Sequence, residues 1–270
     1  MHSILDLSNL WRDRFDHVYC ISFAPYKDRR EKLLEEVRRV HIVDYVTDDF
    51  THPFFTVHYT VENPFEQLLM SHPNFRYPKH NMRFNKGALS LAIGNYCVMK
   101  EALSLGYKRI LIIEDDIAFL KDFTSIIELF EGGIPDTDII MYDKVVPNKT
   151  AWEHDMKNGV FCNGKYVKLS PQDIVWTTSC YSVNEKAMHH IIRCQETSMN
   201  VADYYTNAFL PTENYSMILG NTGISRSASI LGLACQRPSR ETISDHGNTN
   251  SVYNQNGLYD CGINLGEYNI

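Results

Sequence analysis

Apolar and polar residues alternate along the N-terminal part of the chain in a pattern that predicts a strand, a helix and a second strand. Residues 17–23 form a β-branched and aromatic run, which is typical of a strand. In residues 28–40 the apolar positions repeat at helical spacing, which predicts an amphipathic helix. Residues 41–47 predict a second strand, so the chain begins as the β-α-β unit of a Rossmann-like sheet.

The remainder of the chain continues this alternation after one long interruption. Residues 51–83 are rich in proline, aromatic residues and histidine without a clean period, so we expect an excursion over the sheet edge. After residue 219 the chain is rich in Ser, Gly and Asn, and we expect an irregular C-terminal part. The pattern predicts an α/β fold with a mixed, mostly parallel sheet flanked by helices. Its helices are predicted over 86–105 (with Gly106 as the C′ residue), 122–130, 185–195 and from 200, and its strands over 108–113, 135–143 and 175–183.

The most informative stretch is the predicted strand over 108–113, which ends in three consecutive carboxylates, Glu114, Asp115 and Asp116. An apolar strand of this kind is typical of the centre of a parallel sheet, and ligands of open α/β sheets bind beyond the carboxyl ends of such strands. Three acids placed there repel one another unless a positive group lies among them. A divalent cation shared with phosphates would meet that need, and a solvated acidic turn is the alternative.

Composition narrows the classes of partner and compartment. The chain has 270 residues of ordinary globular composition, and its net charge of −7 argues against nucleic acid as the main partner. Its 7 cysteines are scattered without CxxC spacing, so we expect no zinc site or disulfide framework and a reducing, cytoplasmic compartment. The N-terminal residues lack the apolar core of a signal peptide, and we expect no transmembrane segment.

Four segments carry a resemblance to a known family. The most specific is Ile113-Glu114-Asp115-Asp116, and the others are residues 18–23 with Asp28-Arg29-Arg30, the helix from Gly87 to Glu101 with Gly106, and residues 178–187 with Asp203 downstream. Together they resemble glycosyltransferase family 25, the lipopolysaccharide-type galactosyltransferases with a GT-A fold, whose signature is Leu-Glu-Asp-Asp. One departure is Gly94-Asn95, where the family usually carries Ser-His.

The resemblance implies a fold, an activity and partners. It implies one GT-A domain over residues 1–270, with a nucleotide-sugar-binding half over 17–145 and an acceptor half and tail over 146–270. It further implies inverting, metal-dependent transfer of a hexose from a UDP-sugar to a surface glycan or lipooligosaccharide, with Mn²⁺ as the usual ion. The family's donor is UDP-galactose, although nothing in the spacing distinguishes galactose from glucose. A lipid-linked acceptor would bring the enzyme to the inner membrane surface.

The expected metal ligands are Glu114, Asp116 and His246. Because side chains alternate along extended backbone, Glu114 and Asp116 would point one way and Asp115 the other. We therefore expect Asp116 to be a direct ligand and Glu114 a direct or water-mediated one, unless Glu114 only caps the next segment. Asp115 would then face ribose or a basic partner. The resemblance adds His246, since GT-A enzymes often complete the metal shell with a late histidine.

The expected donor-binding residues lie at the end of the first strand and in the helix after it. GT-A folds hold the nucleotide base near the positions of Ser22 and Phe23. Arg29 and Arg30 follow closely, and a guanidinium suits contacts with Asp115 or a phosphate. For either arginine, a solvated helix face is the alternative.

Asp203 is the expected general base, because it is in register with the downstream acid of the family. A base must lie within reach of the proton of the acceptor hydroxyl. Its alternative role is a charge that favours the dipole of the helix predicted from residue 200. Asp143, at a predicted strand end, is the reserve candidate.

Two other functions fit parts of the pattern. Gly94-Asn95 in place of Ser-His favours a non-catalytic relative that keeps the fold as a glycan- or partner-binding protein. Acids that follow a buried strand also serve metal-dependent phosphohydrolases and nucleotidyltransferases.

Overall fold

The computed structural model describes the elements that surround the acidic motif. The described residues are 9–61, 86–119, 123–142, 160–161, 165–170, 178–197, 199, 210–211, 217–218, 222–229 and 233–236. Among them, no helix is both long and apolar enough to cross a membrane.

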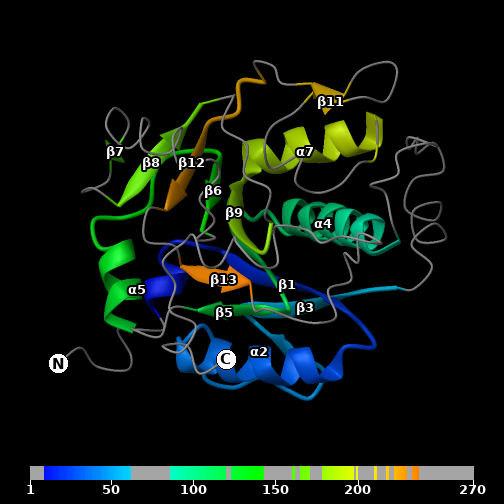
Figure 1. Ribbon diagram of the computed structural model, residues 1–270, viewed down its shortest axis with the longest axis vertical. Coiled ribbons are helices and arrows are strands. Elements are labelled where there is room, and N and C mark those ends of the chain that lie inside the picture. The colour runs from blue at the N-terminus through cyan, green and yellow to red at the C-terminus, as the bar shows by residue number, and fades with distance from the viewer. Residues whose placement is uncertain are drawn as a thin grey trace, which may run out of the picture.

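A nine-stranded sheet forms the centre of the molecule (Figure 1). The strand order across it is β2-β3-β1-β4-β9-β6-β12-β8-β7. In that order the strands are Thr51–His52, Phe55–Thr60, His17–Phe23, Arg109–Glu114, Cys180–Asn184, Ile139–Met141, Arg226–Ser229, Tyr166–Leu169 and Val160–Phe161.

The sheet is mixed, as expected, but parallel pairing is confined to two places. β3, β1 and β4 are parallel neighbours, and so are β6 and β12. The other pairs are antiparallel. In the interior, β9 runs antiparallel to both β4 and β6. At the two edges, β2 pairs antiparallel with β3, and β8 pairs antiparallel with both β12 and β7. The prediction of a mostly parallel sheet is therefore wrong, and the longest parallel block is β3-β1-β4. In that block the carboxyl ends of three strands meet at one edge.

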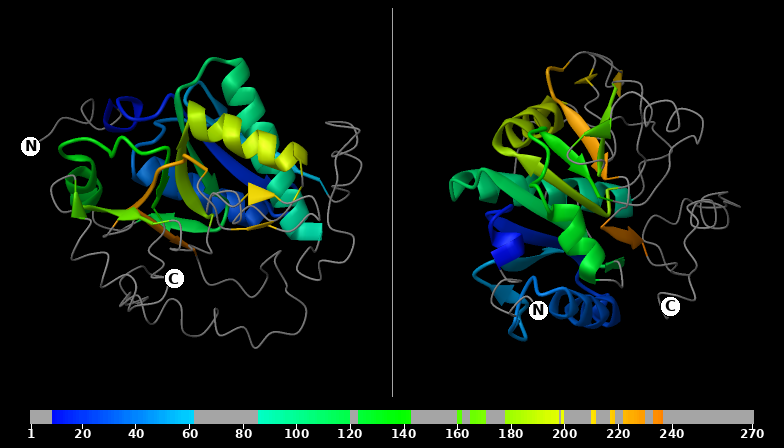
Figure 2. Two further views of the ribbon diagram at one scale, coloured as in Figure 1. Left: turned by 90° about the horizontal axis from the view of Figure 1, so that it is seen from above. Right: turned by 90° about the vertical axis from the view of Figure 1, so that its left-hand side faces the viewer.

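Helices cover both faces of the sheet (Figure 2). α2 (Lys27–Arg39) and α5 (Phe123–Phe130) lie on one face, and α4 (Lys86–Ser104) and α7 (Glu185–Thr197) pack together on the other. Successive residues of β4 bury alternately into the two layers, with Leu111 and Ile113 toward α2 and Ile110 and Ile112 toward α4 and α7. β4 is therefore buried on both faces, as its sequence predicts.

The predicted helices agree closely with the observed ones. α2, α4, α5 and α7 begin and end within two residues of the expected bounds. Gly106 follows α4 with a φ of +77°, which is the left-handed conformation expected of a C′ glycine. β4 and β9 also lie where strands were predicted, and β6 is shorter than predicted.

The second strand was predicted in the wrong place. Residues 41–47 contain no strand, although Ile42, Val43 and Val46 are buried in the core. The chain leaves α2 through His41, whose φ of +56° turns it away from extended backbone. The strand that takes the predicted place beside β1 is instead β3, which lies in the segment that was expected to be an excursion. Residues 62–83 of that segment lie outside the described residues.

The C-terminal part contains strands where an irregular tail was expected. β12 is an interior strand of the main sheet, and β13 (Ala234–Gln236) pairs antiparallel with β5 (Ile117–Phe119). A further small sheet, which precedes this part of the chain, joins β10 (Leu210–Pro211) and β11 (Met217–Ile218). The predicted boundary between the two halves near residue 145 lies outside the described residues and stays a prediction.

Candidate functional site

The candidate site lies at the carboxyl ends of β1 and β4, beside the first turn of α2. Ile21 of β1 pairs with Glu114, the last residue of β4. Ser22 therefore faces the turn that follows β4, where Asp115 and Asp116 lie. α2 starts at Lys27, so its first turn brings arginines to the same edge of the sheet.

Asp115 is buried and contacts both Ser22 and Arg29. Ser22 Oγ donates a 2.6 Å hydrogen bond to Asp115 Oδ2, and Arg29 Nη1 lies 3.5 Å from Asp115 Oδ1. Burial raises the pKa of Asp115 to about 6 against the opposing effect of the Ser22 hydrogen bond, and the charge of Asp116 adds to the rise. A buried carboxyl beside another acid is a place where positive charge is stabilising.

Asp116 shares the same arginine. Arg29 Nη1 lies 3.4 Å from Asp116 Oδ2, so one guanidinium nitrogen faces oxygens of both aspartates. The prediction that Asp115 and Asp116 point in opposite directions is therefore wrong. β4 ends at Glu114, and the two aspartates form the turn before β5, where the alternation of extended backbone no longer applies.

Glu114 contacts the start of β9. Thr178 Oγ1 donates a 3.1 Å hydrogen bond to Glu114 Oε1, and the backbone N–H of Glu114 donates to the carbonyl of Ser179. Thr178 and Ser179 belong to the later segment that resembles family 25. The structure thus brings two of the resembling segments together at the acidic motif.

Arg30 is anchored beside the site. Its Nη1 donates to Ser22 Oγ at 3.3 Å and to the carbonyl of Phe23 at 3.0 Å, and the residue is only 7% exposed. The rings of Phe50 and Tyr59 lie 6.0 and 5.1 Å from its guanidinium carbon. Arg30 therefore fixes the end of β1, which holds Ser22 toward Asp115.

The aromatic neighbours of the two arginines were not predicted. Tyr26 lies under the Arg29 guanidinium at 4.6 Å, and the half-exposed Tyr59 lies beside Arg30. The sequence offers a weak signal for Tyr26, which follows a proline at the end of the first strand. It offers none for Tyr59, because β3 was not recognised as the neighbour of β1.

The acids fit a divalent cation only if a ligand contributes oxygens. Asp115 Oδ1 and Asp116 Oδ2 converge on one positively charged nitrogen, so two hard oxygen donors face a common point. Within the described ranges, no group of three or more His, Cys, Asp or Glu residues is placed to hold a metal. A cation held by one or two carboxylates together with nucleotide phosphates is common for Mg²⁺ and related ions, and it matches this donor set.

Three predicted functional residues lie outside the described residues. These are Asp203, the expected base; His246, the expected late metal ligand; and Asp143, the reserve base. Their roles stay predictions.

Gly94 and Asn95, which replace the family's Ser-His, are both built into the packing of α4. A Cβ at Gly94 would lie 2.9 Å from Ile21 Cγ2 and 3.0 Å from Thr60 Cγ2, so the glycine lets α4 approach β1 and β3. Asn95 is buried, where it accepts a hydrogen bond from the Tyr181 hydroxyl and donates to the carbonyl of Leu91. This pair therefore joins α4 to the sheet.

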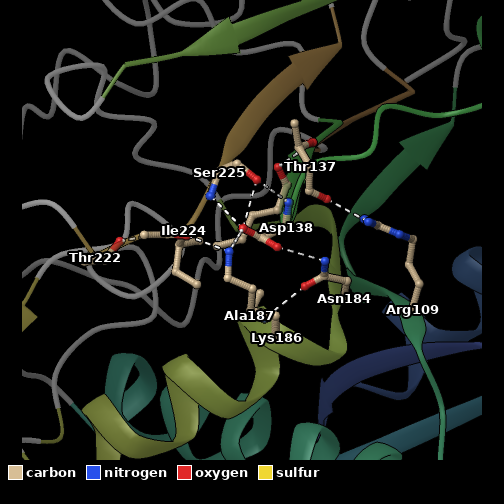
Figure 3. A network of polar contacts seen from close by, with 11 residues as sticks. Arg109, Thr137, Asp138, Asn184, Lys186, Ala187, Thr222, Ile224 and Ser225 are labelled. Carbon is tan, nitrogen blue, oxygen red and sulfur yellow. Dashed lines mark hydrogen bonds and ion pairs between the residues drawn. The ribbon is translucent and has the colours of Figure 1, made fainter.

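A second polar network lies around the start of β6 (Figure 3). Asp138, before β6, accepts hydrogen bonds from Asn184 Nδ2, Lys186 Nζ, and the backbone N–H and Oγ of Ser225. Burial works to raise the pKa of Asp138, but these hydrogen bonds outweigh it and lower the pKa to about 2. The donors come from the end of β9, the first turn of α7 and the residue before β12, so the network ties these elements to the start of β6.

Comparison with known proteins places these observations in a family. The sequence model described as "Glycosyltransferase family 25 (LPS biosynthesis protein)" matches residues 15–206. The human protein named "Inactive glycosyltransferase 25 family member 3" is 28% identical over 114 residues, which is 42% of this chain and 18% of that protein. The chain thus matches less than a fifth of the length of that relative.

Two solved structures show a distant likeness. Mouse xyloside xylosyltransferase 1 aligns over 76% of each chain with 11% identity and a TM-score of 0.31. A complex of the galactosyltransferase LgtC with donor and acceptor sugar analogues aligns over 66% of this chain and 62% of that one, with 10% identity and a TM-score of 0.35. These scores are too low to transfer any property to this chain.

Proposed function

The chain belongs to glycosyltransferase family 25. From that membership we propose that it transfers galactose, a hexose, from UDP-galactose to a glycan acceptor. The observation that carries this proposal is the convergence of Asp115, Asp116 and Arg29 at the carboxyl ends of β1 and β4. That edge is where open α/β sheets bind nucleotides. A buried acid pair with a nearby guanidinium suits a diphosphate with its cation.

A divalent cation, Mn²⁺, is part of the proposal. Asp116 and Asp115 would hold it together with the donor's diphosphate, Glu114 would contribute through water, and His246 would complete the shell. When bound, such a cation neutralises the charge that develops on the leaving diphosphate.

The remaining roles concern the chain's own side chains. Ser22 and Phe23 would lie against the nucleotide, and Arg30 would fix them through its hydrogen bonds. Asp203 would accept the proton of the acceptor hydroxyl while that oxygen bonds to the anomeric carbon and the bond to the diphosphate breaks. This sequence of bonds inverts the anomeric centre.

The proposed acceptor is a surface glycan or lipooligosaccharide. It follows from family membership, since lipopolysaccharide biosynthesis is part of the family's description. A lipid-linked acceptor would place the protein on the cytoplasmic side of the inner membrane as a peripheral enzyme.

A second candidate is a protein that binds a nucleotide or glycan without transferring sugar. It is favoured by Gly94 and Asn95, which here serve packing in place of the family's Ser-His. The human relative named as inactive is consistent with it.

Release of UDP distinguishes the two candidates. The wild-type protein would be incubated with UDP-galactose, UDP-glucose or GDP-mannose, with Mn²⁺ and a panel of glycan acceptors. Acceptor-dependent UDP release that is lost in Asp116→Asn supports the transferase. Nucleotide binding without any release, in the wild type and across all acceptors, supports the binding protein. Release of inorganic phosphate or pyrophosphate in place of UDP contradicts both.

A further inference from the structure

Arg29 presents one nitrogen to two carboxylates. Its Nη1 lies 3.5 Å from Asp115 Oδ1 and 3.4 Å from Asp116 Oδ2. A tight hydrogen bond between a guanidinium and a carboxylate measures about 2.8 Å. Both contacts are longer, so Arg29 neutralises the acids without the close bidentate geometry that makes such a pair rigid.

The neighbouring arginine is held in a different way. Arg30 donates hydrogen bonds to Ser22 Oγ and to the carbonyl of Phe23 and is almost fully buried. The Arg29 side chain is 16% exposed, and its guanidinium lies over the ring of Tyr26 at the start of the helix. Of these two adjacent residues of α2, Arg30 is therefore anchored, whereas the guanidinium of Arg29 is accessible to solvent.

We propose that Arg29 is an exchangeable counter-ion for Asp115 and Asp116. It pairs with both acids while no divalent cation is bound, leaves them when a cation binds, and then pairs with the diphosphate of the nucleotide. This role rests on the proposed function, because it assigns a regulatory step to the same site. A divalent cation at these carboxylates repels the guanidinium that already lies against them, and this repulsion favours the departure of Arg29.

Exchange of Arg29 couples the binding of cation and nucleotide. A cation that binds alone leaves the guanidinium without these two acids, whereas a bound diphosphate offers it new oxygens in a geometry that suits its planar fork. Each ligand therefore favours the other through Arg29. The coupling must be reciprocal, because it is an equilibrium property.

Arg29→Met tests this role, because methionine keeps apolar length and removes the charge. Mn²⁺ alone should bind the variant about tenfold more tightly than the wild type. This factor corresponds to about 1.4 kcal/mol of binding free energy. Free Mn²⁺ is measured from its paramagnetic resonance signal. UDP at saturating Mn²⁺ should bind about tenfold more weakly, as measured by titration calorimetry. A merely structural arginine would weaken both.

Two further variants control for charge and folding. Lys27→Met removes the same charge from the same helix, at an exposed residue that pairs with Glu31, and should leave both affinities unchanged. Arg29→Lys keeps the charge and should keep the Mn²⁺ affinity close to that of the wild type. It also provides a second test if Arg29→Met does not fold.

The outcomes separate this role from the proposed function. If the wild type binds Mn²⁺ and UDP but Arg29→Met binds Mn²⁺ no more tightly, the counter-ion role is overturned and the donor site remains. If Arg29→Lys binds Mn²⁺ as tightly as Arg29→Met does, the counter-ion role is also overturned. If the wild type binds neither Mn²⁺ nor UDP, the proposed function fails and the role of Arg29 fails with it.

Discussion

Ser22 Oγ donates a 2.6 Å hydrogen bond to Asp115 Oδ2 and so joins the end of β1 to the turn after β4. Both residues are almost fully buried. The contact places the hydroxyl of one parallel strand against the carboxyl that follows its neighbour. It therefore holds the two strand ends together at the proposed ligand site.

Ser22→Ala should destabilise the protein and disturb Asp115. The change removes the hydroxyl donor from a buried carboxylate, which costs about 1–3 kcal/mol in the free energy of unfolding. Urea unfolding measures this loss. Ser104→Ala is the matched control, because Ser104 Oγ donates to the Glu101 carbonyl on an exposed helix end. An equal effect of the two changes would contradict the importance of the Ser22 contact.

Arg30→Met should cost more stability than Arg29→Met. Arg30 is buried and donates to Ser22 Oγ and to the Phe23 carbonyl, so its loss leaves buried acceptors unsatisfied at about 2–3 kcal/mol. Arg29 lies at the site edge with longer contacts and should cost less. Unfolding midpoints of the two variants compare these costs directly. The reverse order would contradict the distinction between an anchored and an exchangeable arginine.

Gly94→Ala should be destabilising although alanine favours helices. The added Cβ would overlap Ile21 Cγ2 and Thr60 Cγ2, and overpacking of this kind costs about 1–3 kcal/mol. That cost should exceed the gain of about 1 kcal/mol from helix propensity. Thr60→Ser removes one of the two methyl groups, so the double variant should recover part of the loss. A Gly94→Ala protein more stable than the wild type would contradict the close approach of α4.

Asp138 should stabilise the fold above its unfolded pKa and lose this effect in acid. Its pKa is lowered from 3.8 to about 2, so the folded state releases the proton more readily than the unfolded state. The stabilisation is complete above pH 4 and is lost as the pH falls toward 2. It should amount to about 1–2 kcal/mol.

Comparison with Asp138→Asn measures this effect. The difference in unfolding free energy between the wild type and the variant should shrink as the pH falls from 7 to 2.5. Asp136→Asn, at an exposed position nearby, serves as the control. A difference that stays constant over this range would contradict the lowered pKa of Asp138.

The fold could be predicted from sequence where apolar runs were strong and clearly bounded. β1, α2, α4 and β4 meet that condition, and each lies close to its predicted place. β3 has the alternation typical of a strand, Phe-Thr-Val-His-Tyr-Thr, but it was missed because it lies inside a segment rich in proline, aromatic residues and histidine.

β12 shows a different limit. Its sequence Arg-Ser-Ala-Ser is polar, yet all four residues are buried in the sheet. Arg226 donates to the carbonyl of Ser170, and Ser227 Oγ bonds with Thr137 Oγ1, so tertiary partners satisfy the polar groups. Hydrophobic patterning cannot find a strand whose burial depends on partners far away in sequence.

Several residues of the candidate site lie together as the sequence predicted, but the orientation of its acids differs from the prediction. The acids after β4 do lie at the carboxyl edge beside Ser22 and the two arginines. Which acids face each other depends on the residue at which β4 ends. The alternation argument assumed extended backbone as far as Asp116, but β4 ends at Glu114, and the turn that follows brings Asp115 and Asp116 to the same arginine.

The central claim is that this edge binds a UDP-sugar with a divalent cation, and a thermal-shift titration tests it most directly. The melting temperature would be measured with UDP and with UDP-galactose, each with and without Mn²⁺, for the wild type and Asp116→Asn. A ligand that binds only the folded state raises the melting temperature by mass action. The account predicts a rise that needs both nucleotide and Mn²⁺ and that disappears in Asp116→Asn. No rise with either nucleotide, or an equal rise in Asp116→Asn, would contradict it.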